Sequence, residues 1–209
     1  MKKVYFVRHG ETEGNVNKFF QTADTQLTDK GLSGAKAVAQ RFKHLEVDVI
    51  LASPFKRAQQ TAQEISSLLN LSVETVDSLH EMNQAISIRG KDWVSPEGQE
   101  YHALHKENFF NPDWNYNGAE NHGHLVKRIE SALELIENHT AENIVVVTHG
   151  YFLGLLISFL LLNKNPDSDL NKTVFGKLHI LSNVAITEFI FDKNEWKLFT
   201  FNDHAHFAE

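Results

Sequence analysis

Two short apolar runs, far apart in the chain, end in the same dipeptide. Residues 4–10 read VYFVRHG and residues 144–150 read IVVVTHG. Continuous apolar runs of this length, rich in β-branched residues, are typical of strands that are buried on both faces. The glycine after each histidine lets the chain turn sharply where the strand ends. The two runs therefore predict a fold in which two buried strands each carry a histidine at one end.

Helical and β-rich patterns alternate along the rest of the chain. Thr28 is a predicted N-cap, because apolar residues recur after it at three- and four-residue steps. Ser53 and Pro54 predict the start of another helix, with the proline in its first turn. The pattern predicts strands at 4–7, 47–51, 71–76, 144–147, 185–191 and 196–201, and helices at 29–42, 54–69, 121–137 and 151–162.

This alternation predicts an α/β fold. We expect a three-layer α/β/α sandwich with a mostly parallel central sheet, into which a terminal hairpin puts one antiparallel strand. Residues 80–118 are less regular and rich in glycine, proline and aromatic residues, which indicates a small cap inserted between core elements. The aromatic rings there either line a substrate pocket or pack the cap against the core. The length of 209 residues favours one domain over 1–209, with the cap at approximately 80–118.

Composition excludes several kinds of protein. The chain has 20 basic and 27 acidic residues, a formal net charge of −7, which argues against a basic nucleic-acid interface. It has no cysteine, so disulfides, thiolate zinc sites and cysteine nucleophiles are ruled out. The first residues contain too few apolar side chains for a secretory signal, and the apolar run 151–162 is too short to span a bilayer. We therefore expect a cytoplasmic protein that binds neither nucleic acid nor membrane.

His9 and His149 are expected to lie close together. Ligands of open α/β sheets bind beyond the carboxyl ends of the strands, where both histidines are predicted. Arg8, next to His9, offers a permanently charged fork of donors that suits phosphate. Histidine offers a nucleophile or an acid–base group near neutral pH. The combination favours phosphoryl transfer over acyl or hydride chemistry.

Four motifs, in order along the chain, resemble those of one enzyme family. They are RHGETEGN at 8–15, LTDKG at 27–31, SPFKRAQQTA at 53–62 and VTHG at 147–150. Together they resemble the histidine phosphatase superfamily, also called the phosphoglycerate mutase-like family. The resemblance implies that His9 is the nucleophile that accepts a phosphoryl group. It also implies that Arg8, Asn15, Arg57 and His149 surround the phosphoryl oxygens.

The implied chemistry sets requirements on these residues. The attacking nitrogen of His9 must be unprotonated, so we expect its other ring nitrogen to donate to a backbone carbonyl. The guanidiniums of Arg8 and Arg57 and an imidazolium at His149 are expected to stabilise the charge on the phosphoryl oxygens. These protein cations do the usual work of a metal, so we expect neither a metal nor a cofactor.

The general acid is assigned by a shorter resemblance. Leu79-His80-Glu81 resembles the start of the acid motif of the family, although Ala85 and Ser87 depart from the glycine and tryptophan expected there. Glu81 is therefore the expected catalytic acid, and a solvated loop carboxylate is the alternative interpretation. Glu120 is the rival acid, unless it is a carboxylate that favours a helix N-terminus.

The resemblance, together with the residues, implies a metal-independent phosphatase that hydrolyses phosphate monoesters through a phosphohistidine intermediate. Its partner is a small-molecule phosphate monoester, whose identity the sequence leaves open together with the oligomeric state. One alternative is a mutase of the phosphoglycerate type, which passes the phosphoryl group to another hydroxyl. It is disfavoured because the bases of the cap are only Arg89, Lys91 and Lys106. The other alternative is a non-catalytic binder of phospho-ligands.

Paired histidines also occur outside these motifs. The closest pairs are His122 with His124 and His204 with His206. Neither pair has the spacing or the acidic neighbours of a known metal motif. We expect these four histidines to lie on the surface.

Overall fold

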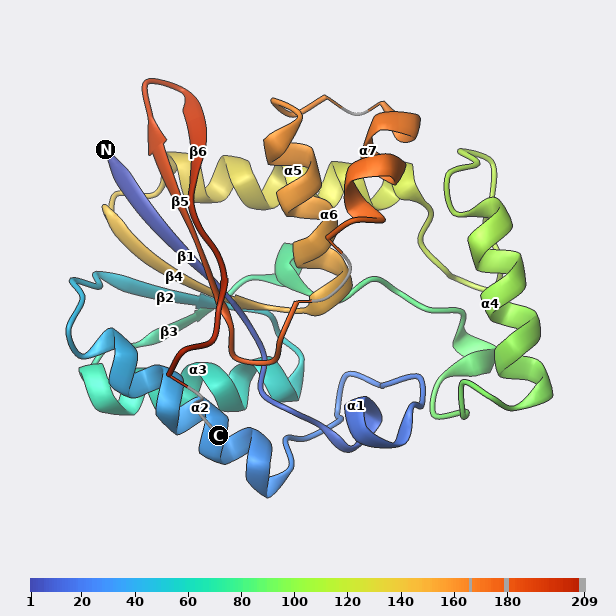
Figure 1. The fold of residues 1–209 in the computed structure, drawn as a ribbon, viewed down its shortest axis with the longest axis horizontal. Coiled ribbons are helices and arrows are strands. Elements are labelled where there is room, and N and C mark those ends of the chain that lie inside the picture. Colours follow the sequence, from blue (N-terminus) through green and yellow to red (C-terminus); the bar gives the residue numbers. More distant parts are fainter. Residues whose placement is uncertain (166, 179–180, 207–209) are drawn as a thin grey trace.

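A six-stranded sheet with the strand order β3-β2-β4-β1-β5-β6 forms the centre of the fold (Figure 1). The computed structural model describes residues 1–165, 167–178 and 181–206. The strands are β1 (Lys2–Arg8), β2 (Val49–Ala52), β3 (Val73–Thr75), β4 (Asn143–Thr148), β5 (Ile186–Asp192) and β6 (Glu195–Asp203). Strands β1 to β4 run parallel, and β5 is antiparallel to both of its neighbours, β1 and β6. Of these six strands, β5 therefore runs against the others, which confirms the predicted sheet.

Helices cover both faces of the sheet, which confirms the three-layer sandwich (Figure 1). The helices are α2 (Asp29–Phe42) and α3 (Lys56–Leu69) on one face, and α5 (His122–Asn138) and α6 (Gly150–Leu161) on the other. Neighbouring residues of a strand point to opposite faces. Val4 and Phe6 accordingly lie in the core with α5 and α6, and Tyr5 and Val7 lie in the core with α2 and α3. This double burial explains the uninterrupted apolar run in β1.

The predicted N-cap at Thr28 is confirmed, and the helix expected from about residue 121 has a cap of the same kind. The side chain of Thr28 accepts a hydrogen bond from the backbone N–H of Gly31 at the start of α2. The side chain of Asn121 accepts one from the backbone N–H of His124 at the start of α5. In both cases a side-chain oxygen satisfies an N–H that has no partner within the helix.

The predicted start of α3 is wrong by two residues. The helix begins at Lys56, and Pro54 lies before it rather than in its first turn. The backbone N–H of Ser53 donates to Val147 O at 3.0 Å, so residue 53 still follows the strand direction of β2. The chain therefore needs residues 54 and 55 to turn before the helix can begin.

The cap has more regular structure than the sequence pattern indicates. It contains the short 3-10 helix η2 (Ile86–Ile88) and the 13-residue helix α4 (Pro96–Asn108). Ser95 caps α4 by accepting a hydrogen bond from Gly98 N, and Pro96 occupies its first turn. A serine followed by a proline is a typical start of a helix, and an interpretation of the segment as irregular overlooks this signal. The remaining helices are α1 (Glu13–Asn17), η1 (Asp77–Leu79) and α7 (Ser168–Phe175).

The cap has a small core of its own at the end of the molecule that holds α1 and α4 (Figure 1). Its buried residues, with Trp93 and Trp114 packed against them, are Phe20, Ala85, Ile88, Tyr101 and Ala119. Backbone hydrogen bonds join the segment after α1 to the cap, from Phe20 N to Lys91 O at 2.9 Å and from Trp93 N to Lys18 O at 2.8 Å. The segment after α1 and the cap therefore form one continuous wall.

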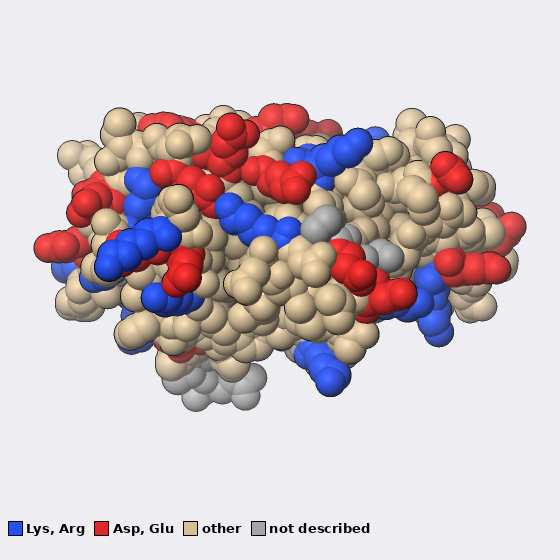
Figure 2. Space-filling view, turned by 90° about the horizontal axis from the view of Figure 1, so that it is seen from above, with Lys and Arg blue, Asp and Glu red and all other residues tan. Residues whose placement is uncertain are grey.

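Charged side chains are interspersed on the face that Figure 2 shows. Lysines and arginines there lie among aspartates and glutamates, and uncharged residues cover much of the surface around them. This mixing agrees with a chain that carries more acidic than basic residues. Among the described residues, no helix combines the length and the apolar character needed to cross a bilayer.

Two glycines in first helical turns provide a test of the packing. A Cβ at Gly31 in α2 would lie 2.0 Å from Glu11 O, whereas a Cβ at Gly123 in α5 would come no closer than 3.5 Å, to Asn121 Oδ1. We expect Gly31→Ala to lower the free energy of unfolding by about 2 kcal/mol or more, because the loop after His9 must move. We expect Gly123→Ala to leave it unchanged or to raise it by up to about 1 kcal/mol. Urea unfolding measures both, and a Gly31→Ala variant as stable as the wild type would contradict the packing described.

Candidate active site

The ends of β1 and β4 bring His9 and His149 together. Beyond the paired strands, His9 N still donates to Thr148 O at 2.9 Å. The two imidazole rings lie with their centroids 5.1 Å apart. The repeated His-Gly pattern thus marks one site at the carboxyl edge of the sheet, as the sequence predicts.

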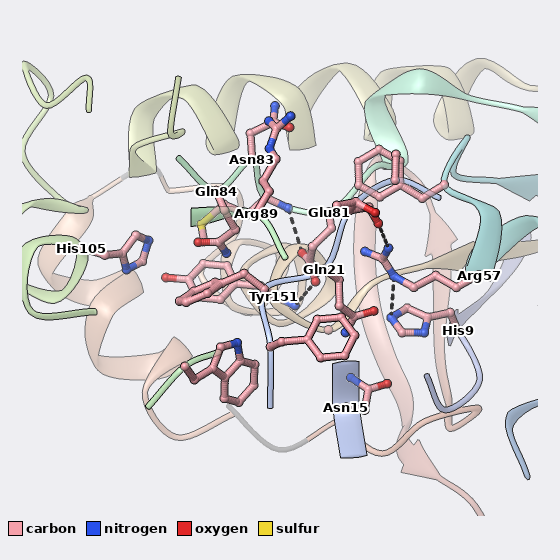
Figure 3. Close-up of a pocket in the computed structure, with 18 of the residues that line it drawn as sticks. His9, Asn15, Gln21, Arg57, Glu81, Asn83, Gln84, Arg89, His105 and Tyr151 are labelled. Atoms are coloured by element: carbon pink, nitrogen blue, oxygen red, sulfur yellow. Dashed lines mark hydrogen bonds between the residues drawn. The ribbon is translucent and has the colours of Figure 1, made fainter. Parts of the chain in front are cut away.

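The imidazole of His9 is held in one orientation and one tautomer. Its Nδ1 lies 2.7 Å from Gly10 O, and a carbonyl can only accept, so Nδ1 carries the proton. Its Nε2 accepts a hydrogen bond from Nε of Arg57 at 3.2 Å, which Figure 3 shows as a dashed line. Nε2 is therefore the unprotonated nitrogen. The contact of the other ring nitrogen with a backbone carbonyl is the one that the sequence analysis expects.

Burial keeps the His9 imidazole neutral. The residue is 2% exposed, and burial together with the positive charges of Arg57 and Arg8 lowers the pKa of His9 well below its ordinary value. A proton on this ring would be both poorly solvated and repelled. At pH 7 Nε2 is therefore unprotonated, and its lone pair accepts the hydrogen bond from Arg57.

The start of α3 fixes Arg57 beside His9. The Arg57 side chain is 2% exposed, and its Nη1 donates to Thr22 O at 2.8 Å. Its guanidinium carbon lies 5.1 Å from the centroid of the Phe55 ring. Burial lowers the pKa of Arg57 to about 10, so the group stays charged at pH 7.

Thr61 ties α3 to the turn that follows His9. Its hydroxyl accepts a hydrogen bond from Gly10 N at 3.0 Å and donates to Arg57 O at 2.8 Å. Residues 57 and 61 lie one turn apart on the same side of a helix. The spacing within the motif at 53–62 therefore lets one helix supply a guanidinium and also anchor the neighbouring loop.

Arg8 and Asn15 complete the polar end of the site. The Nη1 of Arg8 donates to Leu181 O, and Arg8 Nε is buried with no hydrogen-bond partner among the described residues. Asn15 caps the start of α1 with Thr12, and its Oδ1 accepts from Thr12 N at 3.2 Å. Both residues line the same cavity as His9. The structure thus brings Arg8, Asn15 and Arg57 to one end of that cavity, as predicted.

His149 is placed as predicted but differs in charge from the expectation. It is fully buried, and its Nε2 lies 2.7 Å from the hydroxyl oxygen of Ser53. Burial and the charge of Arg57 lower the pKa of His149 well below its ordinary value. The ring is therefore neutral at pH 7 in this structure, and the expected imidazolium is not found. The sequence could not show this, because the burial and the neighbouring guanidinium arise from the tertiary fold.

Glu81 faces the cavity from the segment after η1. Its Oε1 accepts hydrogen bonds from Met82 N and Phe152 N, both at 2.9 Å, and its Oε2 accepts one from Tyr151 N at 3.1 Å. The carboxylate therefore occupies the N-terminal end of α6, where backbone N–H groups lack helical partners. In Figure 3, Glu81 lies between the Arg57–His9 pair and Tyr151.

Glu120, the rival acid, is held in a different way. Arg128 donates to both of its oxygens, from Nε at 2.9 Å and from Nη2 at 2.7 Å, and Asn83 N donates at 2.8 Å. Burial alone would raise the pKa of Glu120, but these bonds and the Arg128 charge lower it overall. Among the described residues that line the cavity, Glu81 is included and Glu120 is not. The geometry thus makes Glu120 part of an ion pair that fixes the segment carrying Glu81.

The cavity has a volume of about 510 Å³ and extends from His9 at one end to His105 at the other (Figure 3). Rings supply much of its wall away from the arginines, namely Phe19, Phe20, Trp93, Tyr101, His102, His105, Tyr151 and Phe175. Both interpretations of the cap aromatics therefore hold. Trp93 and Tyr101 line the cavity, whereas Phe109 is buried in the main core and Trp114 packs on the cap core.

Three further groups at the site have no predicted role. Ser53 contacts His149, and the backbone oxygen of Thr22 accepts from Arg57. Asn183 donates through Nδ2 to His9 O at 2.8 Å and to Asn15 Oδ1 at 3.2 Å. Ser53 lies in a quoted motif, which is a signal for its role. Asn183 comes from a distant part of the chain, and no local pattern marks it.

The four paired histidines are not all on the surface. His124 and His204 are exposed, as expected. His206 is half-buried, and His122 is buried with its ring 4.9 Å from that of Phe110. The surface expectation is wrong for His122, because the first turn of α5 packs against the segment at 109–110. Within the described ranges, no group of three or more histidines and carboxylates is placed to hold a metal ion.

Known proteins resemble this chain in sequence over most of its length. A family model described as the histidine phosphatase superfamily (branch 1) matches residues 4–204. A protein of Hydrogenobacter thermophilus, provisionally named phosphoserine phosphatase 2, is 30% identical over 171 residues, which are 77% of this chain and 79% of the relative. A protein of Yersinia pestis (strain Pestoides F), provisionally named phosphoglycerate mutase GpmB, is 32% identical over 169 residues, 77% of this chain and 75% of the relative.

The fold also matches solved structures. A mutant phosphoserine phosphatase from Entamoeba histolytica, in complex with phosphoserine, superimposes with a TM-score of 0.77. The two sequences are 26% identical, and the match covers 100% of each chain.

The titration of His105 gives a testable effect on stability. Burial, together with the charge of His102, lowers the pKa of His105 to about 4, below the value of about 6.5 in an unfolded chain. Between these values the unfolded chain binds a proton that the folded protein does not, so the free energy of unfolding falls as the pH falls. From pH 7 to pH 5.5 we expect His105→Gln to lose about 1 kcal/mol less stability than the wild type. Urea unfolding at both pH values measures this difference, and equal losses would contradict the lowered pKa.

Proposed function

The chain belongs to the histidine phosphatase superfamily, and from this premise we propose that it hydrolyses phosphate monoesters through a phosphohistidine intermediate without a metal ion. The observation that carries the proposal is the unprotonated Nε2 of His9, which lies 3.2 Å from Arg57 Nε at one end of the cavity. A nitrogen lone pair beside fixed guanidiniums is arranged to attack a phosphorus atom whose oxygens those guanidiniums bind.

The substrate phosphate would bind at the polar end of the cavity. A phosphate monoester is dianionic, and in the transition state its charge spreads over three equatorial oxygens. Arg8 and Arg57 provide two positive charges there, and the amide N–H groups of Asn15 add donors. The dianion would also favour a proton on His149 and raise its pKa, because opposite charges stabilise each other.

In the first step, Nε2 of His9 forms a bond to phosphorus while the bond from phosphorus to the ester oxygen breaks. Glu81, which must enter this step protonated, donates its proton to that oxygen, and the alcohol leaves. In the second step, the Glu81 carboxylate takes a proton from water, whose oxygen attacks phosphorus as the N–P bond breaks. Among the described residues, Oε2 of Glu81 accepts one hydrogen bond, from Tyr151 N, so this oxygen has room for the transferred proton.

No step of this scheme needs a metal ion. Positive charge at the phosphoryl oxygens is the contribution that a metal makes in many phosphoryl transfers. Here Arg8 and Arg57 would supply it, since both side chains are held in place by hydrogen bonds to backbone oxygens. Fixed charges of this kind need no reorganisation during the reaction.

The bases of the cap favour hydrolysis over the mutase alternative. A mutase for a small phosphorylated acid needs cations for the carboxylate of its substrate. Of the three cap bases, Arg89 lines the cavity, whereas Lys91 pairs with Glu97 at 3.4 Å and Lys106 is exposed on α4. One arginine at the rim is a weak site for a carboxylate, so we propose water as the acceptor of the phosphoryl group.

Replacing His9 tests the nucleophile. We expect His9→Ala to lower p-nitrophenyl phosphate hydrolysis about 1,000-fold or more, because the variant lacks the nitrogen that we propose attacks phosphorus. The acid-labile phosphoenzyme seen after a rapid quench of the wild type should vanish in this variant. His204→Ala, at an exposed histidine away from the cavity, is the matched control and should keep both. Residual labelling of His9→Ala would place the nucleophile elsewhere.

Replacing Glu81 tests the proton donor. An alkyl ester needs a proton on its leaving oxygen, whereas p-nitrophenolate leaves without one. We expect Glu81→Gln to lower kcat/KM about 100-fold for an alkyl phosphate and less than about tenfold for p-nitrophenyl phosphate. The control is Glu120→Gln, which should affect both esters alike. Equal losses in Glu81→Gln would remove Glu81 as the donor, and a dependence on the leaving group in Glu120→Gln would transfer the role to Glu120.

A further inference from the structure

We propose that the alcohol released by this protein carries an uncharged, planar aromatic ring, which binds among the ring side chains of the cavity between Glu81 and His105. The inference rests on the proposed phosphatase function and names the class of its substrate. It concerns the part of the cavity beyond the arginines, which Figure 3 shows extending away from His9 past Gln84 and Tyr151.

The size of the cavity calls for a leaving group with substantial bulk. Its volume of about 510 Å³ is typical of sites that enclose ligands of drug size. The phosphoryl group takes only the end at Arg8, His9 and Arg57. A leaving group of a few polar atoms would leave the rest of the volume to water against apolar walls, which is unfavourable.

Ring side chains approach this space from several elements. On the α1 side, the ring of Phe20 lies 6.2 Å from that of Trp93 and 4.9 Å from that of His102. On the α6 side, the ring of Tyr151 lies 5.8 Å from that of His105 and 4.7 Å from that of Phe175. All six residues of these two groups line the cavity. A flat ring bound there would have aromatic neighbours from both groups.

The charges in this part of the cavity disfavour an anionic leaving group. Apart from Arg8 and Arg57, the described lining residues include one permanent positive charge, that of Arg89, and this residue is exposed. His105 is neutral at pH 7, because burial lowers its pKa to about 4. A carboxylate placed here would lose its hydration without gaining a buried cation.

The polar groups of the wall suit uncharged heteroatoms. The amides of Gln21, Asn83 and Gln84 line the cavity and offer both donors and acceptors without a net charge. Rings favour other rings over saturated groups of similar size, since edge-to-face and offset contacts add to the burial of area. The combination of aromatic walls and neutral amides points to an aryl or heteroaryl group rather than to an alkyl chain or a small acid.

Three alkyl phosphates separate these possibilities. Benzyl phosphate supplies a planar ring, cyclohexylmethyl phosphate supplies similar apolar bulk without planarity, and phosphoserine supplies a small charged acid. All three release an alkyl alcohol, so differences in kcat/KM report mainly on how the cavity binds the leaving group. We expect kcat/KM for benzyl phosphate to be about 100-fold higher than for phosphoserine. We expect it to be about three- to tenfold higher than for cyclohexylmethyl phosphate.

Two tryptophans of the cap form a matched pair of variants. Trp93 and Trp114 are both half-buried and pack against the same cap core, but of the two only Trp93 lines the cavity. We expect Trp93→Ala to lower the ratio of kcat/KM for benzyl phosphate to that for phosphoserine about tenfold. Trp114→Ala should leave this ratio as it is in the wild type. Urea unfolding of both variants shows whether the cap core is weakened equally.

The outcomes distinguish this inference from the function on which it rests. Phosphoserine turned over as fast as benzyl phosphate, or equal rates for the benzyl and cyclohexylmethyl esters, would overturn the aromatic class and leave the phosphatase function standing. An equal fall of the ratio in both tryptophan variants would also overturn it, because the fold of the cap would then set selectivity. If no ester is turned over and no phosphoenzyme forms, the proposed function fails and the inference fails with it.

Discussion

The hydrogen bond from Arg57 to Nε2 of His9 is the interaction on which the rest of the site depends. It requires the end of β1 and the start of α3 to meet at one edge of the sheet, which the parallel order of β1, β4 and β2 provides. A buried guanidinium is costly unless its donors are satisfied, and here His9 and Thr22 O accept them. The same bond requires an unprotonated Nε2, so the placement of one charge also prepares the nitrogen that we propose as the nucleophile.

Local sequence signals predicted much of this arrangement, and tertiary effects account for what they missed. The buried strands β1 and β4, the cap at Thr28 and the approximate start of α5 follow from patterns within a few residues. The late start of α3 does not, because it depends on Ser53 N bonding to Val147 O in another strand. The neutral state of His149 depends on burial beside Arg57. Such effects come from residues that are distant in sequence.

The two ends of the cavity differ in how they are built. The arginine end is formed where strands end and helices begin, and short motifs encode these junctions. The ring-lined end is formed by the segment after α1, the cap and the starts and ends of α6 and α7, which meet only in the folded chain. Motifs therefore identify the family and contain the nucleophile that we propose, while the proposed site for the leaving group is lined mainly by residues that lie outside the motifs.

Glu81 connects these two ends. Its carboxylate accepts a hydrogen bond from the backbone N–H of Tyr151, whose ring belongs to the ring-lined end. In Figure 3, Glu81 lies between Tyr151 and the Arg57–His9 pair. The oxygen that joins phosphorus to the leaving alcohol must lie where the two ends meet. A proton donor is useful only within hydrogen-bonding distance of that oxygen. The start of α6 thus positions three groups, which are His149 before the helix, Tyr151 in its first turn and the Glu81 carboxylate that accepts from its backbone N–H groups. The proposed chemistry and the proposed choice of leaving group therefore depend on one structural element.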